Sequence, residues 1–106
     1  MSIEIKVNDD AEQCKIKVVG QVDLYTSPEL RKVLLSCTDK LSKKILVELS
    51  EVEYMDSSGV ATLVEGLRSA IKQKKDFAIL SPSPAVRKVL NLARLENVFT
   101  ILESEQ

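Results

Sequence analysis

The sequence predicts a single α/β domain in which one mixed β-sheet has helices packed on it. Apolar residues repeat first every two positions and later at helical spacing, in segments that follow the order β-β-α-β-α-β-α-β. The chain has 106 residues, near the commonest domain size, and no repeat, linker or low-complexity tract divides it. We therefore expect residues 1–106 to form one domain, with right-handed β-α-β connections.

The first two strands are expected to pair as an antiparallel hairpin. Apolar and polar residues alternate over residues 3–7 and again over residues 14–20, as in strands with one buried face. The turn residues Asn8-Asp9-Asp10 begin a short polar connection between them. A connection of this length favours antiparallel pairing.

Three amphipathic helices are expected after this hairpin. The first has two possible starts, because Thr26 and Glu29 have capping-box spacing while Ser27 and Pro28 suit the N-cap and first helical position. Ser83-Pro84 starts the third helix in the same way. The apolar stripes are Leu30, Val33, Leu34, Cys37 and Leu41 in the first helix, Val60, Leu63, Val64, Leu67 and Ile71 in the second, and Val86, Val89, Leu90 and Ala93 in the third.

Three further strands are expected between and after the helices. Residues 45–49 are almost continuously apolar, which is typical of a central strand covered by helices and not exposed to water on one side. Residues 77–80 and 98–102 are shorter apolar runs that complete the sheet.

The composition argues against several functional classes. With 15 basic and 16 acidic residues the net charge is −1, so nucleic acid is not an expected direct partner. No apolar run reaches the roughly 20 residues that span a bilayer, and the N-terminus has no features of a secretory signal, so we expect a cytoplasmic protein without membrane insertion.

Two residue types that often carry chemistry are absent or poorly spaced for it. The chain has no histidine, which removes the commonest general base and metal ligand. Cys14 and Cys37 match no metal or redox spacing and are expected to be small apolar fillers. We therefore expect no enzyme activity, no cofactor and no metal site.

The segment Asp56-Ser57-Ser58-Gly59 stands between the central strand and the second helix. Asp56 or Ser57 can accept hydrogen bonds from the first free N–H groups of the helix, and the helix dipole favours added negative charge there, so a phosphoserine would suit the site. The alternative is that the segment is simply a good helix cap. Extrapolation of the second apolar stripe back to this point makes Ser58 more exposed than Ser57.

Three stretches carry a resemblance to a known family: Val19-Gly20-Gln21-Val22-Asp23, Asp56-Ser57-Ser58-Gly59-Val60 and residues 83–90. In this order they resemble the STAS-domain family of bacterial anti-sigma factor antagonists, or anti-anti-sigma factors. The resemblance implies regulation of transcription by partner switching. The unphosphorylated protein would bind an anti-sigma factor that is also a serine kinase, phosphorylation of Ser57 would end this binding, and a serine phosphatase would restore it.

The resemblance also implies a partner-binding face made of Asp23, Asp56, Ser57, Ser58 and Gly59. For Asp23 a structural role as a strand-end or turn acceptor is the alternative. The alternative that the resemblance leaves open is a small STAS subunit of a lipid-transport ABC system, bracing its ATPase. A nucleotide hydrolase using Asp56 and Ser57 is disfavoured, because the chain has no P-loop and no second patterned carboxylate for a metal.

Two departures from the family pattern bear on these expectations. Family members commonly have glycine where Arg94 stands, at a position that suits a left-handed helix cap. Arginine adopts that conformation at a cost of about 1–2 kcal/mol, so the third helix is expected to end differently. Val60-Ala61-Thr62 also replaces the more usual leucine and glycine after the motif.

Overall fold

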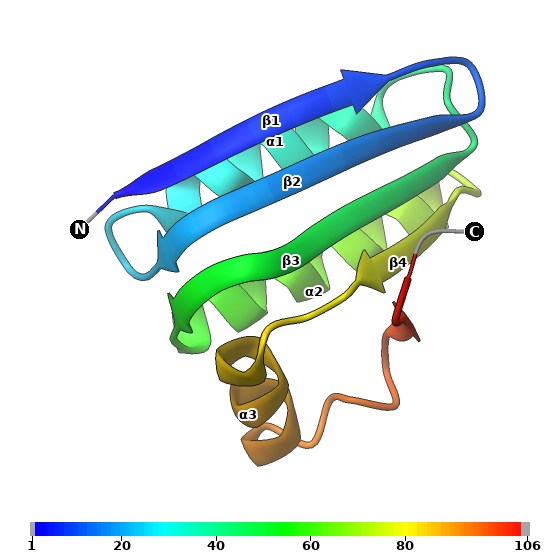
Figure 1. Ribbon diagram of the computed structural model, residues 1–106. Coiled ribbons are helices and arrows are strands. Elements are labelled where there is room, and N and C mark those ends of the chain that lie inside the picture. The colour runs from blue at the N-terminus through cyan, green and yellow to red at the C-terminus, as the bar shows by residue number, and fades with distance from the viewer. Residues whose placement is uncertain (1, 105–106) are drawn as a thin grey trace.

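A five-stranded sheet with the strand order β1-β2-β3-β4-β5 forms one layer of the computed structural model, which describes residues 2–104 (Figure 1). The elements are β1 (Ile3–Asp9), β2 (Gln13–Val22), α1 (Ser27–Thr38), β3 (Lys44–Met55), α2 (Ser57–Lys72), β4 (Asp76–Leu80), α3 (Pro84–Leu92) and β5 (Thr100–Leu102). This order confirms the predicted α/β class and element sequence.

The strand pairing places the carboxyl ends of β2 and β3 side by side. β1 pairs with β2 in the predicted antiparallel hairpin, and β2, β3, β4 and β5 are parallel. β2 and β3 are longer than predicted and stay paired up to Val22 and Met55. Two register shifts interrupt this ladder near Gly20, which has φ +110 and approaches Ser2 so closely that a Cβ would lie 2.5 Å from its carbonyl oxygen.

In the part of the chain that the structure describes, α1 and α2 cover one face of the sheet. α1 and α2 lie side by side on the same face of the sheet in Figure 1 and contact each other. On the other face Leu46 packs in a separate small cluster with Ala78 and Leu80. The predicted central position and burial of residues 45–49 are confirmed, because β3 is the middle strand and Leu46 is only 1% exposed. The expectation that helices cover the strand on this face as well is wrong. Successive parallel strands are added in one direction here, and crossovers of one hand then place their helices on one face.

The last apolar residue of each predicted helical stripe is exposed. Leu41 is 96% exposed because α1 ends at Thr38, and Ala93 is exposed because α3 ends one residue before it. Ile71 lies inside α2 but is also exposed. The other predicted stripe residues are buried or half-buried.

Small residues form part of the buried face of α2. Gly66 and Ala70 are buried, and a Cβ on Gly66 would lie 3.2 Å from side-chain atoms of both Leu34 in α1 and Phe77 in β4. The helix is therefore rotated toward its small residues, so that it approaches its neighbours closely. A stripe drawn through large apolar residues alone misses this rotation, which is why Ile71 was misplaced.

α3 ends in a left-handed cap although the residue in the left-handed conformation is Arg94 and not glycine. Arg94 has φ +59, its N–H donates to the Asn91 carbonyl at 3.0 Å, and the Leu95 N–H donates to the Leu90 carbonyl at 2.9 Å. These two bonds are those of a Schellman motif. The expectation that arginine makes the third helix end differently is wrong, because the two hydrogen bonds and the packing of Leu95 hold the same cap.

Candidate functional site

The candidate site lies where the carboxyl ends of β2 and β3 meet. The Asp56 N–H donates to the Val22 carbonyl at 3.2 Å, so the loop after β2 and the first turn of α2 are neighbours at this edge of the sheet (Figure 1). Open α/β sheets commonly bind ligands or partners at the carboxyl ends of their parallel strands. The structure thus brings Asp23 close to the predicted motif Asp56–Gly59.

Asp56 is the N-cap of α2. Its Oδ1 atom accepts hydrogen bonds from the N–H groups of Ser58 at 3.0 Å and Gly59 at 3.4 Å, and from the Ser58 hydroxyl. Burial by itself would raise the pKa of Asp56, but hydrogen bonds from Ser58, Gly59 and the Leu24 N–H outweigh it and lower the pKa below its ordinary value. The carboxylate is therefore charged at neutral pH.

The two serines of the motif differ in exposure and in bonding. Ser57 is exposed, and within residues 2–104 its side chain has no hydrogen-bond partner. Ser58 is half-buried and its hydroxyl donates a hydrogen bond to Asp56. The wheel-based expectation that Ser58 is the more exposed serine is wrong, because the buried face of α2 runs through Gly59 and Gly66 and so turns Ser57 outward.

Gly59 lets the first turn of α2 approach the strand ends. A Cβ at this position would lie 2.7 Å from Cγ of Met55 and 2.9 Å from Cγ1 of Val22. These distances are shorter than any ordinary carbon contact, so a larger residue would push the helix start away from the sheet. Gly59 is buried and holds Ser57 in place without reaching the surface.

Asp23 stabilises the loop that follows β2. Only 5% of the residue is exposed, and its Oδ1 atom accepts from the N–H groups of Tyr25 at 2.9 Å and Thr26 at 3.0 Å and from the Thr26 hydroxyl. Thr26 in turn accepts from the Asp23 N–H at 2.9 Å. Of the two interpretations of Asp23, this geometry is that of a turn acceptor.

The same loop exposes two large side chains that the sequence analysis did not single out. Leu24 is 67% exposed and Tyr25 is 87% exposed, although both are apolar or aromatic. Their place between a turn-forming Asp23 and the start of α1 is the signal that could have identified them, because neither a strand nor a helix stripe can bury them there. Exposed side chains of this kind are enriched at protein interfaces.

A hollow of about 570 Å³ begins at Ser57 and runs beside α2. Its lining includes the apolar Val60, Ala61 and Val64 from α2 and Leu95 beyond α3, and the charged Glu65 and Arg68. A protruding side chain of a partner could enter it next to the Ser57 hydroxyl. In residues 2–104 no group of three His, Cys, Asp or Glu side chains is arranged to hold a metal, and no helix of that segment is long and apolar enough to cross a membrane.

Comparisons with known proteins agree with the fold and cover nearly the whole chain. Residues 2–106 match the family model of the STAS domain. The anti-sigma-B factor antagonist of Staphylococcus aureus (strain NCTC 8325 / PS 47) is 28% identical over 106 residues, covering 100% of this chain and 98% of that protein. The protein of the same name from Staphylococcus epidermidis is 29% identical, covering 100% and 96%.

Solved structures give the same picture of the fold. An anti-sigma factor antagonist from Mycobacterium paratuberculosis has a TM-score of 0.87 at 24% identity, over 97% of this chain and 87% of that one. The anti-sigma factor antagonist SpoIIAA in its unphosphorylated form has a TM-score of 0.80 at 22% identity, over 94% and 89%. Bacillus SpoIIAA in its phosphorylated form has a TM-score of 0.73 at 20% identity, over 94% and 92%.

Proposed function

This chain belongs to the STAS domain family, and on that basis we propose that it is an anti-sigma factor antagonist controlled by phosphorylation of Ser57. In its unphosphorylated form it binds an anti-sigma factor that is also a serine kinase, which frees the sigma factor. The observation that carries this proposal is the exposed hydroxyl of Ser57, which lies beside the charged Asp56 and has no hydrogen-bond partner in the described part of the chain, residues 2–104. The curated relatives support it, since they are named anti-sigma-B factor antagonists.

The partner-binding face comprises the site residues and the loop beside them. Ser57 contacts the partner directly, together with the exposed Leu24 and Tyr25. Asp23, Asp56, Ser58 and Gly59 act beneath this surface: Asp23 shapes the loop, and the other three fix the first turn of α2 through the cap and close packing.

Phosphorylation changes the charge of this face without requiring a new fold. The phosphate adds about −1.5 to −2 charges beside Asp56, and docking must then desolvate two neighbouring anions. A pair of unit charges ~6 Å apart at an effective dielectric of 20 interacts by about 3 kcal/mol, which corresponds to roughly a hundredfold in affinity. SpoIIAA retains the common fold in both its unphosphorylated and phosphorylated forms, which fits a local switch.

The test uses the anti-sigma kinase encoded by the same organism, with Ser58→Ala as the matched control for Ser57→Ala. With ATP, the wild type and Ser58→Ala are expected to gain one phosphate by intact mass spectrometry, whereas Ser57→Ala gains none. By calorimetry Ser57→Ala should bind the kinase as the wild type does. Ser57→Asp and the phosphorylated protein should bind at least about a hundredfold more weakly.

Two results would contradict this proposal. Phosphorylation of Ser57→Ala to full stoichiometry would show that another residue is the acceptor. Co-purification of the chain with an ABC ATPase, together with no binding to any kinase-like protein, would instead favour a subunit of a lipid-transport system.

A further inference from the structure

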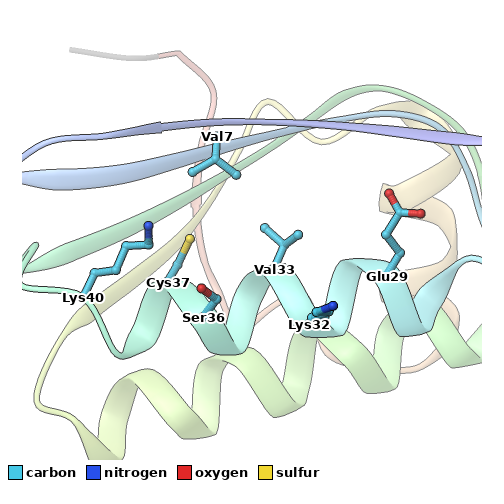
Figure 2. A pocket seen from close by; sticks show the side chains of 7 residues that line it. All are labelled: Val7, Glu29, Lys32, Val33, Ser36, Cys37 and Lys40. Atoms are coloured by element: carbon cyan, nitrogen blue, oxygen red, sulfur yellow. The ribbon is translucent and has the colours of Figure 1, made fainter.

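A cavity of about 400 Å³ separates the edge strand β1 from α1 (Figure 2). Val7 of β1 points across it toward Val33 and Cys37 of α1, and the Cys37 sulfur faces the cavity. Lys40 extends beside this sulfur, and its Nζ lies 3.6 Å from Oδ2 of Asp9. The lining therefore combines the apolar Val7 and Val33 and the Cys37 thiol with polar and charged side chains, which are Glu29, Lys32, Ser36 and Lys40.

The Cys37 thiol has a second thiol as its neighbour. Cys14, near the start of β2, is within hydrogen-bonding distance of Cys37 in the last turn of α1, with 2.6 Å between the two sulfurs. Both cysteines are free, and they are 0% and 1% exposed. Both are buried in the core as small side chains, as their sequence context predicts. Their spacing does not reveal that the fold brings them together.

We propose that Cys14 and Cys37 are a redox modification site that forms a reversible intramolecular disulfide with a hydroperoxide as oxidant. The separation of the two sulfurs exceeds the bond length of about 2.05 Å only slightly, so the bond needs little movement of β2 or α1. Cys37 reacts first, because it alone of the pair lines the cavity.

The reaction balances without any other cofactor. The Cys37 thiolate attacks one peroxide oxygen, the O–O bond breaks, and hydroxide or an alcohol leaves, which gives a sulfenic acid. The Cys14 sulfur then attacks this sulfur, the S–O bond breaks, and water leaves as the S–S bond forms. For hydrogen peroxide, two thiols are oxidised and one peroxide is reduced to two waters. A dithiol reductant reverses the modification.

The site reacts slowly and stands apart from Ser57. Burial raises the pKa of Cys37 to about 12, so the thiol form dominates at neutral pH and the reaction requires sustained oxidant. Entry to the sulfur requires β1 to move away from α1, which an edge strand paired on one side allows. Cys14 and Val22 lie near opposite ends of β2, about 26 Å apart along the strand, so this inference does not depend on the proposed function.

The test is performed on the full reduced chain. The protein is exposed to excess hydrogen peroxide for a prolonged time and then alkylated in denaturant. Its intact mass should be that of a monomer without alkyl groups, because the disulfide protects both cysteines. Trypsin should release residues 7–15 linked to residues 33–40, and dithiothreitol should separate them. The crosslinked protein should unfold at a midpoint about 5–15 °C higher than the reduced protein.

The variants Cys14→Ala and Cys37→Ala are matched controls that retain one thiol each. Neither should show the mass change of an internal disulfide or the higher unfolding midpoint after peroxide treatment. The inference is overturned if wild-type cysteines remain alkylatable, give only sulfinic acid, or crosslink only between chains at a rate that grows with protein concentration.

Discussion

The Asp56 carboxylate is both the N-cap of α2 and the charge adjacent to Ser57. It accepts from the N–H groups of Leu24, Ser58 and Gly59 and from the Ser58 hydroxyl. Within residues 2–104 this leaves Ser57 as the hydroxyl without a hydrogen-bond partner at this end of the helix. One side chain therefore determines the position of the helix start and the electrostatic surroundings of the proposed acceptor. The two roles can be separated by substitution.

Asp56→Ala should lower the free energy of unfolding by about 1 kcal/mol at neutral pH, whereas Asp56→Asn, which retains a cap acceptor, should lower it by less. The measurement is urea unfolding followed by circular dichroism. Since the pKa of Asp56 is lower in the folded chain than in the unfolded chain, its charge stabilises the fold fully above about pH 4. That contribution is lost as the pH falls through the folded value, so the deficit of Asp56→Ala should shrink in acid. A deficit that grew toward low pH would contradict the assignment.

Residue-scale prediction from the sequence succeeded for the motif and failed for its surroundings. The residue types of segment 56–59 at a strand–helix junction predict a helix cap, and in the structure Asp56 is the N-cap of α2. The exposure of Ser57 relative to Ser58 did not follow, because it depends on how far α2 rotates to pack its glycines. The contact between Cys14 and Cys37 joins a strand to a helix and has no signature in local spacing.

Two helices end without the glycine that their C-terminal caps favour. Lys74 after α2 and Arg94 after α3 both have positive φ, at φ +60 and +59, and each occupies the position at which Schellman caps favour glycine. Tertiary packing imposes the left-handed conformation on residues that disfavour it. The sequence predicted the existence and order of all elements, but their ends depend on such caps and on tertiary contacts, so Leu41 and Ala93 were placed on helices that stop earlier.

Arg94→Gly should therefore raise the free energy of unfolding by about 0.5–1 kcal/mol, because the relief of left-handed strain exceeds the added entropy of the unfolded chain. Ala93→Gly is the matched control: Ala93 has φ −84, and glycine there should lower stability by about 0.5–1 kcal/mol. Thermal and urea unfolding measure both effects. Equal losses for the two variants would show that the Arg94 side chain stabilises the cap more than its backbone strain destabilises it.

At the scale of the whole molecule, the parallel strands carry the proposed switch at one end and the thiol pair at the other. The ladder between β2 and β3 runs from Gln13 and Lys44 to Val22 and Met55, and the core between them and the helices is continuous. Sequence patterns predicted this sheet, but the position of α1 and α2 on one of its faces follows from strand order, which periodicity does not encode.

Because Ser57 is an exposed first residue of α2, a phosphate there should leave the fold and its stability nearly unchanged. The helix dipole favours the added charge by about 0.3–1 kcal/mol, and repulsion from Asp56 through water opposes it by a similar amount. The phosphorylated protein and Ser57→Asp should therefore keep the wild-type far-ultraviolet circular dichroism and unfold within about 1 kcal/mol of it, even though binding to the kinase falls about a hundredfold. Adding salt should change the stability difference little, because the two opposing terms are both screened. A loss of cooperative unfolding on phosphorylation would mean that the switch acts by disrupting the domain and not by altering one surface.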